Sequence, residues 1–326
     1  MDIRAPQPQR TEAGTAASFR HPNLFIVGAQ KCGTTALADY LREHPDIFVP
    51  MEKEFWFYCD DIERKVPIMP EWRFKLAFED WDKEKYAVDA SPLYMFSTEA
   101  HTRIKECSPD AKIIIMLREP AEMAYSLFYQ LKYGRNEDAD SFEAALDLEP
   151  ERAAGRSIPS NVYFRINTQY TFLGKYADHV QTYFDTFGRD NVHVIIYDDF
   201  RADTQASYLA VLAFLGLDPH TAVEFSVRNP NQRSRTRSLN RLAQRPPKWM
   251  GAITGLFFSR EARWRVRQWI KKLNSVDEPR PPMRPETRAR LNAVFAEDVD
   301  RLGRLLGRDL SHWVAPPKAS SDPEAP

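Results

Sequence analysis

The chain has 326 residues, of which 43% are hydrophobic, so it can bury at least one sizeable core. Its 45 Lys and Arg residues nearly balance its 46 Asp and Glu residues, which leaves a formal net charge of −1. This balance argues against a chain-wide positive field of the kind that attracts nucleic acids or anionic membranes. A local basic site remains compatible with it.

The composition also predicts how the chain is divided. Residues 1–22 and 315–326 are polar and rich in Pro and Ala, so we expect disordered tails there. Between them we expect a single domain over residues 23–314, with a helical C-terminal part at about 237–314. No apolar signal-peptide core and no run of about 18–20 apolar residues is present. With three widely spaced cysteines and no metal-type pair, we expect a cytoplasmic protein without a metal.

Strand and helix patterns alternate along the chain. In chain order, the sequence predicts a strand at 24–29, a helix at 34–44, a strand at 85–91, a helix at 97–108, a strand at 111–119, a helix at 120–134, a helix at 167–188, a strand at 191–200, a helix at 203–217, and helices at 259–274 and 285–307. Residues 228–245 have the composition of a loop that enters a helix. This alternation indicates an α/β fold with a central parallel sheet and helices on both faces. Ligands of such sheets bind beyond the carboxyl ends of the strands.

The first strand is followed by an anion-binding type of loop. Residues 28–35 read GAQKCGTT and lead directly into a helix. Glycines let the backbone curl around an oxyanion, while the free amides and the dipole of the helix favour negative charge. A triphosphatase loop, GxxxxGK[ST], places its lysine after the second glycine, whereas Lys31 precedes Gly33 here. The order therefore disfavours ATP or GTP hydrolysis, and Gln30 breaks the dinucleotide pattern GxGxxG.

Three segments together resemble the sulfotransferases that use 3′-phosphoadenosine 5′-phosphosulfate (PAPS). They are GAQKCGTTAL at 28–37, HPDIFVPMEKEFWFY at 44–58 and IIIMLREPAEMAYSLFYQ at 113–130. The style of the motifs is nearest to the heparan-type and bacterial members of that group. The resemblance covers about residues 23–240 and implies the P-loop-like sulfotransferase fold, with PAPS as donor, 3′,5′-bisphosphoadenosine (PAP) as product and no metal.

The resemblance also implies a donor site. The 5′-phosphosulfate would be held by the loop residues Gln30, Lys31, Cys32, Gly33, Thr34 and Thr35. Arg118 and Ser126 would hold the 3′-phosphate, with a planar guanidinium suited to two phosphate oxygens. Arg235 or Arg237, in a basic stretch without glycine, would complete that site. Cys32 is also typical of a packed thiol, and Arg118 of a surface ion pair with Glu119 or Glu122.

For catalysis, the resemblance points to Lys31 as the cation that stabilises the leaving 5′-phosphate oxygen. Glu54 takes the place of the base that removes the proton of the acceptor hydroxyl, and Lys53 beside it is a helper. His44 and His101 are weaker candidates for the base, because isolated histidines more often cap or pack.

The acceptor is less well defined by the sequence. Heparan-type enzymes read E-K-T-P-x-Y after this segment, whereas DASPLY at 89–94 places Ala90 at the lysine position, which weakens a heparan assignment. Candidate acceptor contacts are mostly aromatic: Trp56, Phe57, Ser91, Tyr94, Phe96, Tyr129, Tyr163 and Phe164. A carbohydrate, a lipid-linked sugar or a secondary metabolite with a hydroxyl would fit. Residues 249–273 mix aromatic and basic side chains, which suits a lid, a peripheral membrane contact or plain packing.

Two other classes of function stay open at this stage. A nucleotide kinase or NTPase would need a carboxylate for Mg²⁺ after a strand, and Asp198 with Asp199 is the one tempting pair. A non-catalytic nucleotide-binding protein would be expected to lack the loop lysine or the acceptor base, and both Lys31 and Glu54 are present.

Overall fold

The computed structural model describes residues 19–219, 223, 225, 232–234, 275–277 and 280–316. Within them, five parallel strands form the central sheet in the order β2-β3-β1-β4-β5. The strands are β1 Leu24–Gly28, β2 Ile47–Phe48, β3 Tyr86–Ala90, β4 Lys112–Leu117 and β5 Val192–Ile196. All residues of β1 and β3 are buried, as expected for apolar strands that are covered on both faces.

The register of the sheet brings three strand ends together. Ile26 of β1 lies opposite Ala90 of β3 and Ile114 of β4, and the β1–β4 pairing shifts by one residue before Gly28. The segments that leave the carboxyl ends of β1, β3 and β4 therefore start along one edge of the sheet. In a parallel sheet this edge is where ligands bind.

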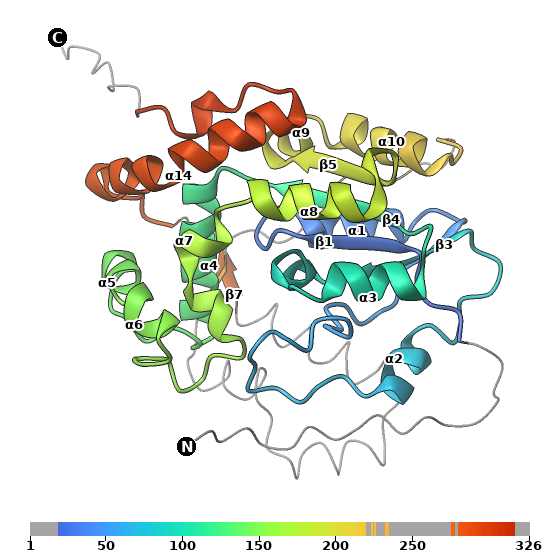
Figure 1. The fold of residues 1–326 in the computed structure, drawn as a ribbon, viewed down its shortest axis with the longest axis horizontal. Helices are drawn as coiled ribbons and strands as arrows, with labels where there is room; N and C mark the ends of the chain where they lie inside the picture. The colour runs from blue at the N-terminus through green and yellow to red at the C-terminus, as the bar shows by residue number, and fades with distance from the viewer. Residues whose placement is uncertain are drawn as a thin grey trace.

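Helices cover both faces of the sheet, as the strand–helix alternation predicts. α1 (Thr34–Leu41) contacts β1 and β3, whereas α8 (Ala177–Phe187) contacts β4 and β5, and α3 (Ala100–Cys107) packs against α8. Figure 1 shows α3 and α8 on the near face of the sheet and α1 on the far face.

The remaining elements surround this core. They are α2 Glu71–Ala77, α4 Pro120–Tyr133, α5 Phe142–Asp147, α6 Glu149–Ala153, α7 Tyr170–Leu173, α9 Tyr197–Ala202, α10 Thr204–Leu215 and α14 Pro285–Leu306; the 3₁₀ helices η1 Pro92–Phe96, η2 Arg165–Thr168, η3 Arg189–Asn191 and η4 Ser311–Trp313; and the antiparallel pair β6 Gln232–Ser234 and β7 Ser275–Asp277. The long helix α14 contacts α4, α7 and α8. Among the described helices, none has the length and apolar character needed to cross a membrane.

Most of the elements predicted from the sequence are confirmed. The predicted strands at 24–29, 85–91 and 111–119 contain β1, β3 and β4, and five predicted helices contain α1, α3, α4, α10 and α14. Ser97 does cap α3, because its Oγ accepts the N–H groups of Glu99 and Ala100 at 3.2 and 2.9 Å. The helix predicted at 259–274, the segment 249–273 and most of the loop at 228–245 lie outside the described residues.

The single helix predicted at 167–188 is wrong, because the structure divides this range into η2, α7 and α8. The break lies at Gly174, where an added Cβ would stand 2.6 Å from the ring of Phe295 in α14. The start of α8 is held by Asp298 of the same helix, whose Oδ2 accepts the N–H of Tyr176 at 2.7 Å. Contacts with α14, 120 residues further along the chain, thus override the local helical pattern.

Two smaller corrections concern the ends of elements. The strand predicted at 191–200 ends at Ile196, and residues 197–200 begin helix α9 instead. Residues 19–22, assigned to the disordered tail, pack on the core: Phe19 contacts Phe74, and the His21 ring nitrogen lies 2.8 Å from the Tyr58 hydroxyl.

We predict that Asp298→Ala destabilises the fold by roughly 1–3 kcal/mol, because it leaves the N–H groups of Tyr176 and Ala177 without an acceptor in a buried place. The matched control is Asp300→Ala on the same helix, which removes an exposed ion pair with Arg304 and should cost under about 1 kcal/mol. Thermal unfolding of the two variants measures the difference. Equal midpoints would contradict the capping role of Asp298.

Candidate active site

The loop between β1 and α1 has the backbone geometry of an anion cradle. Lys31 and Gly33 have φ values of 63° and 92°, in the left-handed region, which turns successive amides toward one side. The first helical bond is donated by the N–H of Leu37 to the Gly33 carbonyl at 3.1 Å. The amides of residues 34–36 therefore precede the helical ladder and form the positive end of the α1 dipole.

Lys31 projects from this loop into a cationic environment. Burial and, after it, the positive charges of Arg280 and Arg118 lower its pKa to about 8, while Glu54 acts in the opposite direction. Three cations are thus close enough to repel one another. A bound anion would relieve that repulsion, which is the electrostatic signature of a phosphate or sulfate site.

Arg118 leaves the carboxyl end of β4 and reaches back to the loop. Its Nη1 donates to the Lys31 carbonyl at 3.4 Å, and its Nη2 lies at the same distance from Glu122 Oε2. Glu122 also forms an ion pair with Arg288 of α14, which shares its negative charge. The predicted ion pair of Arg118 with Glu122 is therefore present, but it is long and leaves the guanidinium available for a stronger anionic partner.

Arg280 is a member of the site that our sequence analysis missed. It precedes α14, lies over the ring of Tyr125 at 5.9 Å and buries its Nη1 without a hydrogen-bond partner. Burial and the nearby charge of Arg118 lower its pKa. In the sequence, DEPRPPMRP reads as a proline-rich spacer between helices, and nothing local indicates that it folds back against α4.

The segment that carries Glu54 is strained and pinned to the end of β3. Glu54 and Trp56 have φ values of 62° and 52°, which cost non-glycine residues on the order of 1–3 kcal/mol each. The Glu54 N–H donates to the Ala90 carbonyl at 3.1 Å. The Glu54 side chain is exposed, yet desolvation raises its pKa against the opposing effects of Lys53 and Lys31. Glu54 is therefore accessible to solvent as a residue, with a carboxyl group that is desolvated close to two lysines.

The ammonium group of Lys53 is buried in the protein and interacts with Glu54. Its Nζ is buried without a hydrogen bond and lies 3.9 Å from Asp39 Oδ1, which already accepts a hydrogen bond from Arg42 at 2.6 Å. Burial lowers the pKa of Lys53, while Asp39 and Glu54 raise it. An ammonium group held in this way is short of acceptors.

Four buried polar atoms without partners belong to this part of the molecule. They are Gln30 Oε1, Lys53 Nζ, Trp56 Nε1 and Arg280 Nη1. Buried polar atoms in native proteins almost always have partners, so such a group indicates places where a ligand supplies the missing hydrogen bonds. Three of the four are donors, which suits a ligand rich in phosphate or sulfate oxygens.

The other predicted donor-site residues vary in exposure. Thr34, Cys32 and Ser126 are buried, whereas Thr35 is half-buried at the start of α1. Cys32 donates its S–H to the Gln30 carbonyl at 3.3 Å, and burial raises its pKa to about 12, so it is an unreactive thiol. Arg235 and Arg237 lie outside the described residues.

The predicted acceptor residues divide into two groups. Trp56 and Tyr129 are half-buried and Tyr163 is exposed, so these three can meet a ligand. The others lie in the interior, where they pack rather than line an open pocket: Phe57, Ser91, Tyr94, Phe96 and Phe164. Ser91 and Tyr94 both donate hydrogen bonds to the buried carboxylate of Asp89, at 2.6 and 2.8 Å. The interior placement corrects their expected role.

Two groups of alternative residues have structural partners. The Asp46 N–H donates to His44 Nδ1, so His44 Nε2 donates to the Asp218 carbonyl, each at 3.1 Å, and the ring has no capacity left for a proton-transfer role. Asp198 accepts from the Trp313 indole at 3.1 Å, and Asp199 is paired with Arg308. The carboxylate pair that a kinase would need thus anchors the C-terminal segment. The ring of His101 packs near Tyr183.

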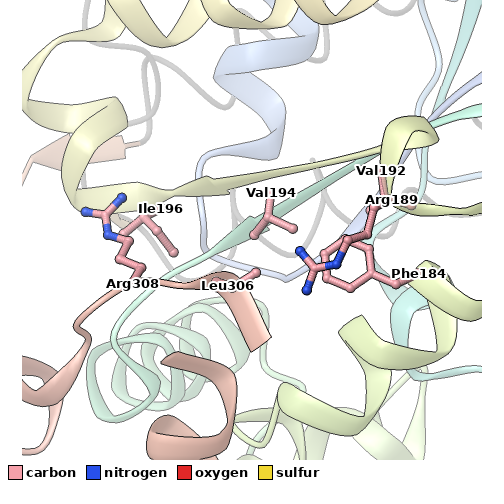
Figure 2. A pocket seen from close by; sticks show the side chains of 7 residues that line it. All are labelled: Phe184, Arg189, Val192, Val194, Ile196, Leu306 and Arg308. Atoms are coloured by element: carbon pink, nitrogen blue, oxygen red, sulfur yellow. The ribbon is translucent and has the colours of Figure 1, made fainter. Parts of the chain in front are cut away.

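A pocket of about 220 Å³ lies beside β5 and is lined by five apolar residues and two arginines (Figure 2). It is lined by Phe184, Arg189, Val192, Val194, Ile196, Leu306 and Arg308. No predicted site residue lines it, and both arginines have partners, the Leu305 carbonyl for Arg189 and Asp199 for Arg308. Among the described residues, no group of three or more His, Cys, Asp and Glu side chains could hold a metal ion.

The fold and the loop define a class of protein: an α/β protein of P-loop-like fold whose first strand-to-helix turn forms an anion cradle. A comparison with protein families narrows this class, because residues 21–303 match the model of the sulfotransferase domain. The chain belongs to the sulfotransferase domain family.

Individual relatives agree with this assignment. Heparan sulfate glucosamine 3-O-sulfotransferase 3B1 of Mus musculus is 26% identical over 218 residues, which make up 65% of this chain and 50% of that protein. The 3-O-sulfotransferase 5 of Homo sapiens is 27% identical over 61% of this chain and 54% of its own length. The chain thus spans about half the length of these relatives. The crystal structure of a sulfotransferase from Alicyclobacillus acidocaldarius is 29% identical, with a TM-score of 0.68 over 90% of this chain and 99% of that one.

The cationic cluster makes a prediction that needs no ligand. Because burial, Arg280 and Arg118 lower the pKa of Lys31 to about 8, its rate of acylation should rise with pH around a midpoint near 8. Arg280→Gln removes one like charge and should move that midpoint upward. Residue-resolved labelling by mass spectrometry across pH 6–11 measures both values. A midpoint that Arg280→Gln leaves unchanged would show that the two side chains do not interact.

Proposed function

We propose that this protein transfers a sulfuryl group from PAPS to the hydroxyl of an acceptor. One observation carries the proposal: Lys31, Arg118 and Arg280 concentrate positive charge at the loop after β1, and the desolvated carboxyl group of Glu54 interacts with Lys31. This arrangement combines an anion site for the donor with a candidate base for the acceptor. Membership in the sulfotransferase family supports the same reaction.

The cationic side chains of the site match the two anionic ends of the sulfuryl donor PAPS. PAPS has a phosphosulfate at one end of its ribose and a phosphate at the other, so it needs two separate groups of donors. The loop amides with Lys31 would hold the phosphosulfate, and Arg118 with Arg280 would hold the 3′-phosphate. Phosphate oxygens would give Arg280 Nη1 the partner that it lacks, and they would offset the positive charges that help to lower the pKa of Lys31 to about 8.

When bound, PAPS would supply the sulfuryl group. The side chains of the protein would accept the proton of the acceptor hydroxyl and stabilise the leaving oxygen. Glu54 accepts the proton of the acceptor hydroxyl as its oxygen attacks the sulfur. Lys31 holds positive charge against the phosphate oxygen that leaves. Lys53, short of acceptors beside Glu54, would keep the carboxylate ionised and orient it. Most of the rate acceleration would come from placement and fixed charge, as in phosphoryl transfer.

The acceptor is proposed to carry a hydroxyl, with carbohydrates as the leading class because the relatives named above are glucosamine sulfotransferases. Trp56, Tyr129 and Tyr163 are the aromatic side chains with enough exposure to contact it. Ala90 replaces the lysine of the heparan-type motif, so the charge recognition of a heparan chain is not carried over. A cytoplasmic location is also kept as a proposal, because the three cysteines Cys32, Cys59 and Cys107 form no disulfide, which suits a reducing compartment.

Donor binding should take up a proton. The pKa of Lys31 is about 8 in the free protein and would rise beside a bound phosphate, so between the two pKa values the complex holds one more proton than the free protein. The affinity for PAP should therefore be constant below pH 8 and fall by up to about tenfold per pH unit above it. Calorimetry in buffers of different ionisation enthalpy measures the uptake. Lys31→Met should abolish it, and uptake that persists in this variant would assign the proton to another group.

Glu54→Gln should lower kcat by about 10²–10⁴ while PAP affinity stays within a few-fold, because the amide cannot accept the proton. The matched control is Glu52→Gln. Glu52 lies two residues before Glu54, and its exposed carboxylate forms an ion pair with Arg73. Transfer of sulfur-35 from labelled PAPS to a panel of hydroxyl acceptors gives the rates. A fully active Glu54→Gln enzyme would remove Glu54 as the base.

Calorimetry with PAP, and with ATP and Mg²⁺ as the comparison, tests the class of nucleotide. We expect micromolar or tighter binding of PAP and at least tenfold weaker binding of ATP, because Lys31 stands before Gly33 and the two aspartates after β5 are engaged elsewhere. Preference for ATP with Mg²⁺ would favour the kinase or NTPase alternative.

A further inference from the structure

A fully buried carboxylate is linked through two hydroxyl groups to the segment that carries Glu54. Asp89, at the end of β3, has no exposed surface and accepts hydrogen bonds from Ser91 Oγ at 2.6 Å and from the Tyr94 hydroxyl at 2.8 Å. Ser91 and Tyr94 have no exposed surface either. None of these three side chains can touch a ligand, so their contribution must be made through their neighbours.

Both hydroxyl groups also accept a hydrogen bond from the backbone of residues 54–57. The Tyr94 oxygen accepts the N–H of Phe57 at 2.9 Å, and Ser91 Oγ accepts the N–H of Trp56 at 3.5 Å. Because each hydroxyl donates its only proton to Asp89, its lone pairs are left to face these amides. The carboxylate thereby fixes the direction in which both hydroxyls act.

Residues 54–57, whose N–H groups donate these bonds, have a strained backbone. Glu54 and Trp56 both have left-handed backbones, at φ values of 62° and 52°. Residues of this kind keep such a conformation only where the surroundings over-determine it. Three backbone N–H groups anchor the segment, those of Glu54 to the Ala90 carbonyl, of Trp56 to Ser91 Oγ and of Phe57 to the Tyr94 oxygen. The Trp56 carbonyl also accepts hydrogen bonds from Arg64 Nη1 at 3.3 Å and from Cys59 Sγ at 3.6 Å.

We propose that Asp89 is a positioning residue for the acceptor base: through Ser91 and Tyr94 it holds the strained segment 54–57 so that the Glu54 carboxyl stays close to Lys31. This inference rests on the proposed role of Glu54. It also gives a function to DASPLY, in which the motif lysine is missing but the aspartate, serine and tyrosine form one network. Burial raises the pKa of Asp89 to about 7 in spite of the two hydrogen bonds, so the carboxylate form that accepts both hydroxyl protons is favoured above about pH 7.

The test compares Tyr94→Phe with Tyr86→Phe. Tyr86 lies at the other end of β3 and donates its hydroxyl to the Leu215 carbonyl at 2.9 Å. Its variant therefore loses a buried tyrosine hydroxyl and one hydrogen bond, whereas Tyr94→Phe loses two, and it does not reach residues 54–57. We expect Tyr94→Phe to lower kcat for sulfuryl transfer by about tenfold to a hundredfold, the effect of displacing a catalytic group by about an ångström. PAP affinity should stay within twofold, and Tyr86→Phe should keep the kcat of the unmodified protein.

The pH profile separates positioning from general damage. Desolvation is the largest cause of the raised pKa of Glu54, so a released segment should hydrate the carboxyl and move the acidic limb of kcat to lower pH. A loss of folded protein would lower kcat at every pH without moving the limb. Ser91→Ala should shift the limb in the same direction, and it keeps the test open should Tyr94→Phe fold poorly. It leaves Asp89, whose own pKa is about 7, in place.

Glu54→Gln measured in parallel distinguishes the two levels of the proposal. If Glu54→Gln is slow while Tyr94→Phe matches Tyr86→Phe in kcat and acidic limb, the positioning role is wrong and the proposed function stands. If Glu54→Gln keeps full activity, the assignment of the base is wrong and the positioning role is lost with it. A slow Glu54→Gln together with a slow, limb-shifted Tyr94→Phe supports both.

Discussion

Mutual repulsion among Lys31, Arg118 and Arg280 is the constraint on which the site depends. Burial and like charge lower the pKa of Lys31 and of Arg280, so the free protein carries an electrostatic cost at the edge of its sheet. Such a cost persists in a folded protein when the rest of the structure holds the groups in place and a ligand relieves it. In this family that ligand would be an adenine nucleotide with anionic groups at both ends.

The parallel sheet is what makes this concentration of charge achievable. Lys31 follows β1, Arg118 follows β4, and the segment of Glu54 is bonded to the last residue of β3, so three neighbouring strands each contribute one part. Arg280 enters from the chain that precedes α14, a helix that also contacts α4. Donor site and candidate base are therefore set by one register, and a shift of β3 against β1 would separate Glu54 from Lys31.

Local features of the sequence explain why much of this could be predicted. Continuous apolar runs identify β1 and β4, and the mostly apolar run YAVDA identifies β3. The GAQKCGTT loop is predicted to bind an anion from its glycines, from Lys31 and from its position before a helix. Arg118 could be predicted as a site residue because it follows a buried strand in a segment that resembles a sulfotransferase motif. These signals are contained in short windows, and the structure preserves them.

What escaped prediction depends on contacts between distant parts of the chain. Arg280 joins the site only because the chain after β7 folds back over α4, and the break at Gly174 is imposed by Phe295 and Asp298. Tyr94 and Ser91 have the residue types of a polar pocket, yet their hydroxyls turn inward to Asp89. Neither the direction of a side chain nor its burial is encoded in the spacing of a motif.

A crystal structure of the protein with PAP tests the central claim most directly. The account predicts the 5′-phosphate on the amides of residues 31–35 and on Lys31 Nζ, with the 3′-phosphate against the guanidinium groups of Arg118 and Arg280. The nucleotide bound in another place, with the loop after β1 making no contact to either phosphate, would contradict it.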